Sequence, residues 1–455
     1  MRRISGAARG ATKRTRNALA GDGIAGSGFY VMLTQVIGKG TFTLTSILLA
    51  NVLSVSEFAS YTYFFVTSAL LSSYISFGIP LSAVRVISEG AVDRSWSSDE
   101  RVGAIVVLSL AAALVAAFAA PFYMPLLLPD EIPLAGAFVV AGAIAAAWAA
   151  LAQAAIYANG GFREAFWPVL AGSVLLVAAV AFSLVVHSLA FLIAANIASM
   201  LIPTIAYVRH LARCRVVGWA SVRRIPRWPV VRAVLAIALP GLGVTTIYAT
   251  MNWLAARALV EHQGSPDQFN QFALGMQWFA LVLFIPLAFG QVLFPRFVQQ
   301  AHAGALPLGA IIKPAGFTFA VVLACAVIGA AGQPLLPLVY GPQYDFPRVF
   351  VFTILVAAAF GGAVNLLGSY VMAIRGTGTW FGVNLVSPAV GLPVIVWAPP
   401  TTAFESARLL CLCYGALTLV AVAVIWRHRR VQRPADVSPH ADAMLRREMD
   451  YPPAI

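Results

Sequence analysis

Long apolar stretches alternate with short polar ones along the whole chain. A helix needs about 20 mostly apolar residues to cross a bilayer, and twelve stretches meet that length. Open sheet edges cannot satisfy their backbone groups in lipid, so each stretch is expected to be helical. The pattern predicts an all-α membrane protein with about 12 transmembrane helices, expected at 28–50, 58–84, 102–128, 134–158, 166–187, 189–208, 233–260, 270–295, 311–333, 347–373, 379–398 and 404–426.

The basic residues indicate how these spans are oriented. With the amino terminus in the cytoplasm, most of the 30 Lys and Arg fall in the tails and cytoplasmic loops, while the opposite loops hold acidic residues. The positive-inside rule favours this arrangement, with both termini cytoplasmic. The longest basic loop separates six spans from six, which is the layout of a two-lobed transporter. The expected units are a basic amino-terminal segment, an N-lobe, a basic linker, a C-lobe and a cytoplasmic tail, at 1–27, 28–209, 210–232, 233–426 and 427–455.

Composition excludes several classes of protein. Hydrophobic residues make up 60% of the 455 residues and charged residues only 10%, which no soluble domain of this length shows. The net charge of +13 does not indicate nucleic-acid binding, because the basic residues are interleaved with apolar spans. The first apolar stretch is too long for a removable signal peptide, and no small-residue cleavage site follows it.

The first span contains a lysine near its middle. Gln35, Lys39, Thr43 and Ser46 recur at helical spacing and form one polar stripe. A cation at this depth is costly unless it faces a protein interior or a wet cavity. We therefore expect the other helices to build a cavity beside Lys39, with Gln35 and Thr43 as neighbours in the site.

The seventh span carries a second polar stripe. Thr250 and Arg257 lie on one face of the predicted helix, together with Thr246 and Trp253, and Asn252 flanks them. Arg257 lies only a few residues from the outer boundary. Lining of the cavity and snorkelling to the surface both fit that position.

Acidic residues are confined to tails, loops and helix ends. All 17 Asp and Glu follow this rule, so no carboxylate is expected near a helix centre. Exporters of cations usually need an intramembrane carboxylate. A cavity with cations and no anions favours an anionic ligand such as a diphosphate. Amide and hydroxyl side chains elsewhere in the spans fit either sugar contacts or helix–helix hydrogen bonds; they are Gln153, Gln277, Gln291, Asn365, Ser369, Tyr370 and Asn384.

Two segments, 48–89 and 337–386, carry a family resemblance. The first contains Phe58 and Tyr61, which match a pair that the family carries in its first outer loop, then Gly78-x-Pro80 and Arg85. The second contains the run Gly341, Pro342 and Tyr344 before the tenth span. Both resemble polysaccharide-biosynthesis (Wzx-type) flippases of the MATE-like, or MOP, superfamily. The resemblance implies two six-helix bundles in a V around a cationic cavity, and translocation of an undecaprenyl-diphosphate-linked oligosaccharide across the bacterial inner membrane. It implies that Lys39 and Arg257 hold the diphosphate and that Arg85 guides it in.

Two other functions fit parts of the pattern. One is a MATE-like exporter of small anionic molecules. The other is a membrane enzyme of polysaccharide assembly, but its only candidate pair, His262 and Asp267, lies in a short loop. We therefore expect a non-enzymatic transporter without cofactor or metal. Its expected partners are an undecaprenyl-diphosphate-linked glycan, membrane lipids and other polysaccharide assembly proteins, and no nucleic acid.

Overall fold

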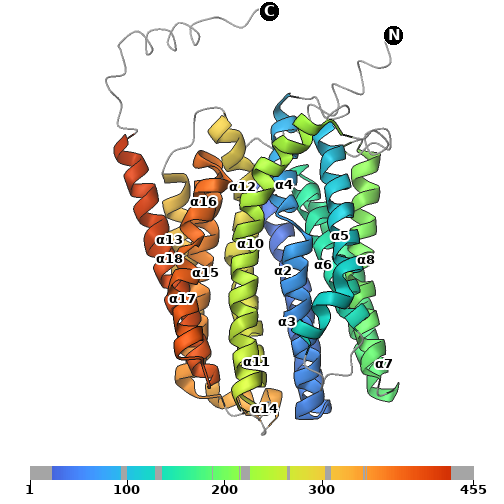
Figure 1. The fold of residues 1–455 in the computed structure, drawn as a ribbon. Helices are drawn as coiled ribbons and strands as arrows, with labels where there is room; N and C mark the ends of the chain where they lie inside the picture. Colours follow the sequence, from blue (N-terminus) through green and yellow to red (C-terminus); the bar gives the residue numbers. More distant parts are fainter. Residues whose placement is uncertain are drawn as a thin grey trace, which may run out of the picture.

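A computed structural model describes residues 23–93, 100–128, 136–186, 188–214, 216, 226–263, 267–302, 309–341, 344 and 346–431. Within those ranges the regular structure is helical, with no strand (Figure 1). The basic amino-terminal segment up to residue 22, most of the linker and the tail after residue 431 lie outside the described residues. So do Pro342 of the second family motif and the side chain of His262.

Among its described residues, the first half of the chain forms seven helices: α2 (Gly23–Val52), α3 (Val55–Ile75), α4 (Ile79–Asp93), α5 (Glu100–Leu127), α6 (Gly136–Ala158), α7 (Phe162–Val186) and α8 (Leu189–Arg213). The second half forms α10 (Trp228–Gln263), α11 (Asp267–Val282), α12 (Phe284–His302), α13 (Gly309–Ala331), a short 3-10 turn (Gln333–Leu335), α14 (Leu336–Tyr340), α15 (Arg348–Arg375), α16 (Thr377–Asn384), α17 (Val386–Trp397) and α18 (Ala403–Val431).

These helices confirm the twelve predicted spans. Ten are long and apolar enough to cross a membrane, counting α16 with α17, and two bent pairs bring the number to twelve in the described part of the chain. The short turn expected between the fifth and sixth spans is present, because Ser188 caps α8 two residues after α7 ends. The chain is therefore a multi-pass membrane protein.

The second and eighth spans are broken, in agreement with the bends that Pro80 and Pro286 indicate in the sequence. α3 and α4 meet at 51°, and α11 and α12 meet at 44°. Between α3 and α4, Phe77 and Gly78 both have positive φ, a conformation that ends an α-helix. A Cβ on Gly78 would collide with the backbone of α10 at Ala238 and Leu242, so only glycine allows the bend to approach α10 so closely.

The two halves are joined at the lower end of the bundle in Figure 1 by buried aromatic rings. Phe58 and Tyr344 come from the two family motifs, far apart in sequence, and their ring centroids lie 6.2 Å apart. The family pattern places Phe58 and Tyr61 in an outer loop, whereas the predicted span 58–84 includes them. They lie inside α3, fully buried, because Ser54 and Glu57 form a capping box that starts the helix before them.

Further polar contacts close the same end. Asn51 of α2 donates to the carbonyl of Val339 in α14 at 2.8 Å, and Asn270 of α11 donates to that of Val55 at 2.9 Å. α14 lies at the lower end in Figure 1, so α2 runs from the upper end to the lower end.

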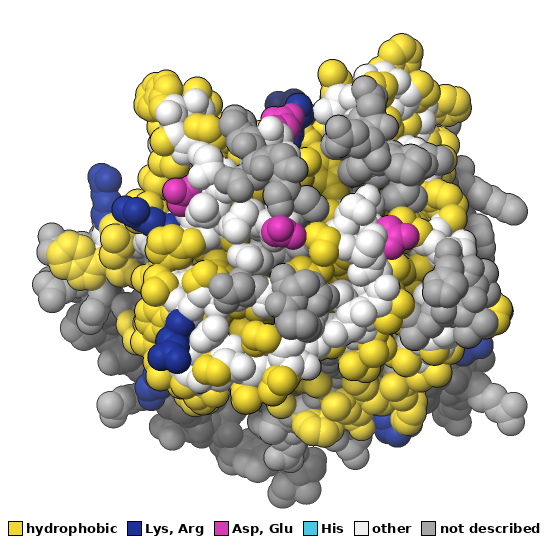
Figure 2. All heavy atoms as spheres, turned by 90° about the horizontal axis from the view of Figure 1, so that it is seen from below, with side chains coloured by type: hydrophobic (Ala, Val, Ile, Leu, Met, Phe, Trp, Pro, Cys, Tyr) yellow, Lys and Arg dark blue, Asp and Glu magenta, His cyan; other side chains and the backbone are white. Residues whose placement is uncertain are grey.

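Figure 2 shows this lower face, where acidic side chains lie on the surface. Four acidic residues predicted to share one side of the membrane are exposed at helix ends here: Glu57, Glu261, Asp267 and Glu405.

Candidate functional site

A cavity of about 480 Å³ lies between the two halves of the chain. α4 and α6 of the first half line it, together with α10, α12, α15, α16 and α18 of the second. Its amide and hydroxyl side chains are all neutral: Gln153, Tyr157, Thr245, Tyr248, Gln291, Asn365, Ser369 and Tyr414. No Lys, Arg, Asp or Glu is among the described residues that line it.

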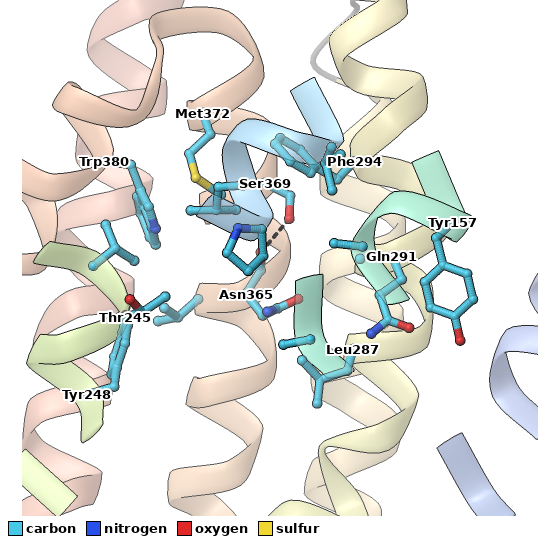
Figure 3. A pocket seen from close by; sticks show the side chains of 18 of the residues that line it. Tyr157, Thr245, Tyr248, Leu287, Gln291, Phe294, Asn365, Ser369, Met372 and Trp380 are labelled. Atoms are coloured by element: carbon cyan, nitrogen blue, oxygen red, sulfur yellow. Dashed lines mark hydrogen bonds between the residues drawn. The ribbon is translucent and has the colours of Figure 1, made fainter. Parts of the chain in front are cut away.

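Asn365 lies in the middle of the cavity wall formed by α15 (Figure 3). From Gly361 to Met372 every residue of α15 is buried except Asn365, so this side chain faces the open space. A Cβ on Gly290 of α12 would collide with its amide oxygen, so the absence of a side chain there makes room for the amide. Among the described residues its side-chain amide has no hydrogen-bond partner, and it can serve a ligand as both donor and acceptor.

Aromatic rings form another part of the lining. Tyr248 of α10 stacks on Tyr414 of α18, with ring centroids 5.6 Å apart and planes 11° apart. Trp380 of α16 lies on the same side of the cavity as Tyr248 in Figure 3. It packs closely against Gly368, which holds the indole in place. Rings of this kind offer apolar faces to a ligand while the amides offer hydrogen bonds.

The opposite side of the cavity is tied to α2. Gln153 donates to the hydroxyl of Tyr157 at 3.3 Å within α6. Gln291 of α12 lines the cavity and accepts a hydrogen bond of 3.0 Å from Gln35 of α2, which is buried. This Gln35–Gln291 bridge joins the first half of the chain to the second. It places the predicted polar stripe of α2 next to the cavity wall.

Lys39 lies one helical turn beyond Gln35 on the same face of α2. It is half-buried and does not line the cavity. Thr43 is buried one turn further along α2. Its hydroxyl donates a hydrogen bond of 3.0 Å to the backbone carbonyl of Lys39. In the described part of the chain, no hydrogen bond or ion pair reaches the Lys39 ammonium group. The Gln35–Gln291 bridge thus connects the helix that carries this unpaired cation to the wall of the neutral cavity.

Arg257 lies apart from the other predicted site residues, near the lower end of α10. Its Nε is 2.6 Å from a carboxylate oxygen of Glu261, and its guanidinium lies 5.1 Å from the ring centroid of Trp253. A third contact crosses to the first half, where Nη1 donates to the carbonyl of Leu126 at 3.2 Å. In this conformation the guanidinium holds two halves of the chain together and does not line the cavity.

The remaining predicted residues lie around the cavity without lining it. The Thr250 hydroxyl is 3.0 Å from that of Tyr74 in α3, a further polar contact between the halves. Asn252 lies next to the hydroxyl of Tyr414. Arg85 follows Val84, which lines the cavity, on α4. None of the seven predicted site residues lines the cavity, and their roles in binding stay predictions.

Sequence reasoning had named four of the lining residues only as secondary candidates: Gln153, Gln291, Asn365 and Ser369. It had grouped them with Gln277, Tyr370 and Asn384, which are buried and do not line the cavity. It did not select Trp380, because a tryptophan in an apolar span carries no signal of its own. The helical register of α15, buried everywhere except at Asn365, becomes visible only in the fold.

The fold is that of transporters of the MATE type in the MOP superfamily. The chain superposes on a mutant form of the MATE transporter VcmN of Vibrio cholerae with a TM-score of 0.66 and 15% identity, covering 89% of this chain and 98% of that one. It also superposes on a MOP-superfamily transporter of Pyrococcus furiosus, whose structure is described as having a binding pocket of reversed polarity. There the TM-score is 0.67 at 12% identity, covering 90% and 95% of the two chains.

At the level of sequence, the chain is similar to the EPS I polysaccharide export inner membrane protein EpsE. It is 24% identical to the protein of Ralstonia nicotianae over 359 residues, which cover 74% of this chain and 78% of that one. The protein of Ralstonia solanacearum is 23% identical over 350 residues. No protein-family model matches the chain. The predicted resemblance to polysaccharide-related proteins of the MOP superfamily is thus confirmed, and these relatives are named as export proteins or transporters.

Proposed function

We propose that this protein is a flippase of the bacterial inner membrane. It moves an undecaprenyl-diphosphate-linked oligosaccharide between leaflets for the assembly of a surface polysaccharide. The fold of MOP transporters supports alternating access between the two halves. The similarity to proteins named for polysaccharide export at the inner membrane supports the substrate class and the location.

The observation that carries this proposal is the unpaired ammonium group of Lys39. Counting along α2 at 1.5 Å per residue, Lys39 lies about 24 Å from Gly23 and about 20 Å from Val52, close to the middle of the bilayer. An unpaired cation at this depth has a functional explanation when a ligand supplies the anion. A diphosphate headgroup that crosses the membrane supplies that charge once in every cycle.

The acidic residues support an anionic rather than a cationic substrate. Where the structure describes them, Asp and Glu lie at or near helix ends, as Glu57, Glu164, Asp267 and Glu405 do. A cation exporter would need a carboxylate near the middle of a span to hold its substrate or coupling ion. Lys39 has the opposite sign. A small anion would meet the same lysine, so the experiment must separate it from a lipid diphosphate.

The experiment is a translocation assay in proteoliposomes. Purified protein is reconstituted with fluorescent undecaprenyl-diphosphate-linked disaccharide, and the rate at which a membrane-impermeant reagent reaches the label is measured. We expect translocation by the wild type, loss of it in Lys39→Ala, and retention in Lys39→Arg and in the control Lys313→Ala, whose side chain is exposed on α13. A wild type that leaves this lipid in place but transports a small organic anion through Lys39 would replace the flippase with an exporter.

A further inference from the structure

We propose that the neutral cavity is a subsite for uncharged sugar rings, separate from the diphosphate site at Lys39. This inference rests on the proposed function and assigns the glycan to named residues. It divides the substrate between two places, with a charged headgroup against α2 and an uncharged glycan between the halves. The Gln35–Gln291 bridge links the two places, because Gln35 lies one turn from Lys39 on α2 and Gln291 lines the cavity on α12.

The charge of the lining decides the class of sugar. The polar groups described around the cavity are amides and hydroxyls, with no basic side chain to pair with a carboxylate. A uronic acid brought here would give up its hydration without gaining an ion pair, and removing a charge from water in this way is costly. A hexose or an N-acetylhexosamine carries only hydroxyl and amide groups, which this lining can satisfy.

The arrangement of donors and rings also suits a sugar. The Asn365 amide has no partner among the described residues and faces the open space, with Gln291 on one side and Thr245 on the other in Figure 3. Trp380 and Tyr248 add aromatic surface on the Thr245 side. A sugar ring has polar edges and apolar faces of C–H groups, so it can bond to amides at its edge and pack on rings with its face. The volume of about 480 Å³ is that of a small-molecule site.

Binding measurements with four probes test the inference. Three are undecaprenyl diphosphates in detergent: one without sugar, one carrying an N-acetylglucosamine–galactose disaccharide, and one with glucuronic acid in place of the galactose. The fourth is the free neutral disaccharide. The variants are Asn365→Ala and Trp380→Phe, with Trp397→Phe as the matched control because Trp397 is largely exposed on α17. Thermal melting checks that each variant is folded.

We expect the wild type to bind the neutral glycolipid at least about 10-fold more tightly than the glucuronate one. Asn365→Ala and Trp380→Phe should each weaken binding of the neutral glycolipid and the free disaccharide by about 3- to 10-fold, the effect of one lost neutral contact, and leave the sugar-free lipid unchanged. Trp397→Phe should change none of the affinities.

Three results would overturn the inference: a wild type that binds the acidic glycolipid as well as the neutral one, variants that weaken the sugar-free lipid equally, or a wild type that binds no form of the sugar. The first comparison needs no variant, so it stands even if both substitutions impair folding. A wild type that binds the free disaccharide through Asn365 but none of the three lipids would leave the sugar subsite in place and remove the lipid-linked substrate. Failure of the subsite and failure of the proposed function are therefore distinguishable.

Discussion

Replacing Lys39 with methionine should stabilise the protein and stop transport. Lys39 is half-buried near mid-membrane and lacks an anionic partner in the described part of the chain. A lysine at the centre of a spanning helix costs about 2.5–3.5 kcal/mol on an insertion scale. Methionine has a similar length and adapts to irregular packing, so it removes most of this cost without leaving a void. Partial exposure reduces the gain, and we expect about 1–3 kcal/mol.

The same substitution removes the group proposed to meet the diphosphate. A hydrogen bond to a charged group contributes about 1.5–3 kcal/mol, which corresponds to about a 10- to 150-fold loss of affinity. Affinity for sugar-free undecaprenyl diphosphate should fall by this factor in Lys39→Met, and translocation should fall with it. Lys39→Arg keeps the charge and should keep most of the affinity. Lys313→Met, on the exposed face of α13, controls for the loss of a lysine as such.

Two measurements decide the outcome. Thermal unfolding in detergent should give a higher midpoint for Lys39→Met than for the wild type, and the proteoliposome assay should give no translocation above the protein-free background. A variant with a lower midpoint would mean that Lys39 makes a stabilising contact in the native protein. A variant with normal transport would remove Lys39 from the substrate path. Either result would refute the reasoning from an unpaired mid-membrane cation.

Other contacts give further predictions. Arg257→Gln breaks the ion pair with Glu261 and weakens the link to the first half. It should slow translocation less than Lys39→Ala does and leave the affinity for undecaprenyl diphosphate within about twofold of the wild type. An affinity loss as large as that of Lys39→Ala would make Arg257 a binding residue. Burial raises the pKa of Tyr344 to about 12, and its hydroxyl has no partner among the described residues, so Tyr344→Phe should raise the unfolding midpoint or leave it unchanged. A lower midpoint would reveal a hydrogen bond at this hydroxyl. Gly78→Ala should destabilise the protein by more than about 1–2 kcal/mol, because φ is positive and α10 lies against it; a midpoint equal to that of the wild type would mean that the bend relaxes freely.

The spans could be predicted because lipid imposes a length and an apolar composition on each helix. Pro80 and Pro286 indicate that the second and eighth spans bend, but the exact break after α3 could not be predicted, since it depends on positive φ at Phe77, a residue type that rarely adopts it. The polar stripe of α2 was predicted from spacing alone, and Gln35 does face a polar partner on another helix. That partner, Gln291, is 256 positions away, and no rule of spacing identifies it.

The cavity itself was harder to predict than the residues around it. Charge is conspicuous in an apolar sequence, so reasoning from residues selected Lys39 and Arg257. The lining described here is neutral, and its residues look in sequence like ordinary helix-packing groups. What distinguishes Asn365 from the buried amide of Asn384 is the direction in which it points, and that is set by how α15 packs in three dimensions.

The two broken spans occupy corresponding positions in the two halves of the chain. Each is the second span of its half, and the upper piece of each, α4 and α12, forms part of the wall around the same chamber. A duplicated gene for six spans would copy its kink together with everything else, and both copies would then face each other across the seam. Such kinks are natural pivots, since the helix is already interrupted there. We expect superposition of residues 23–213 on 228–431 to align the two kinks. The conformation of the kink in one half would then indicate a conformation that the kink in the other half can adopt.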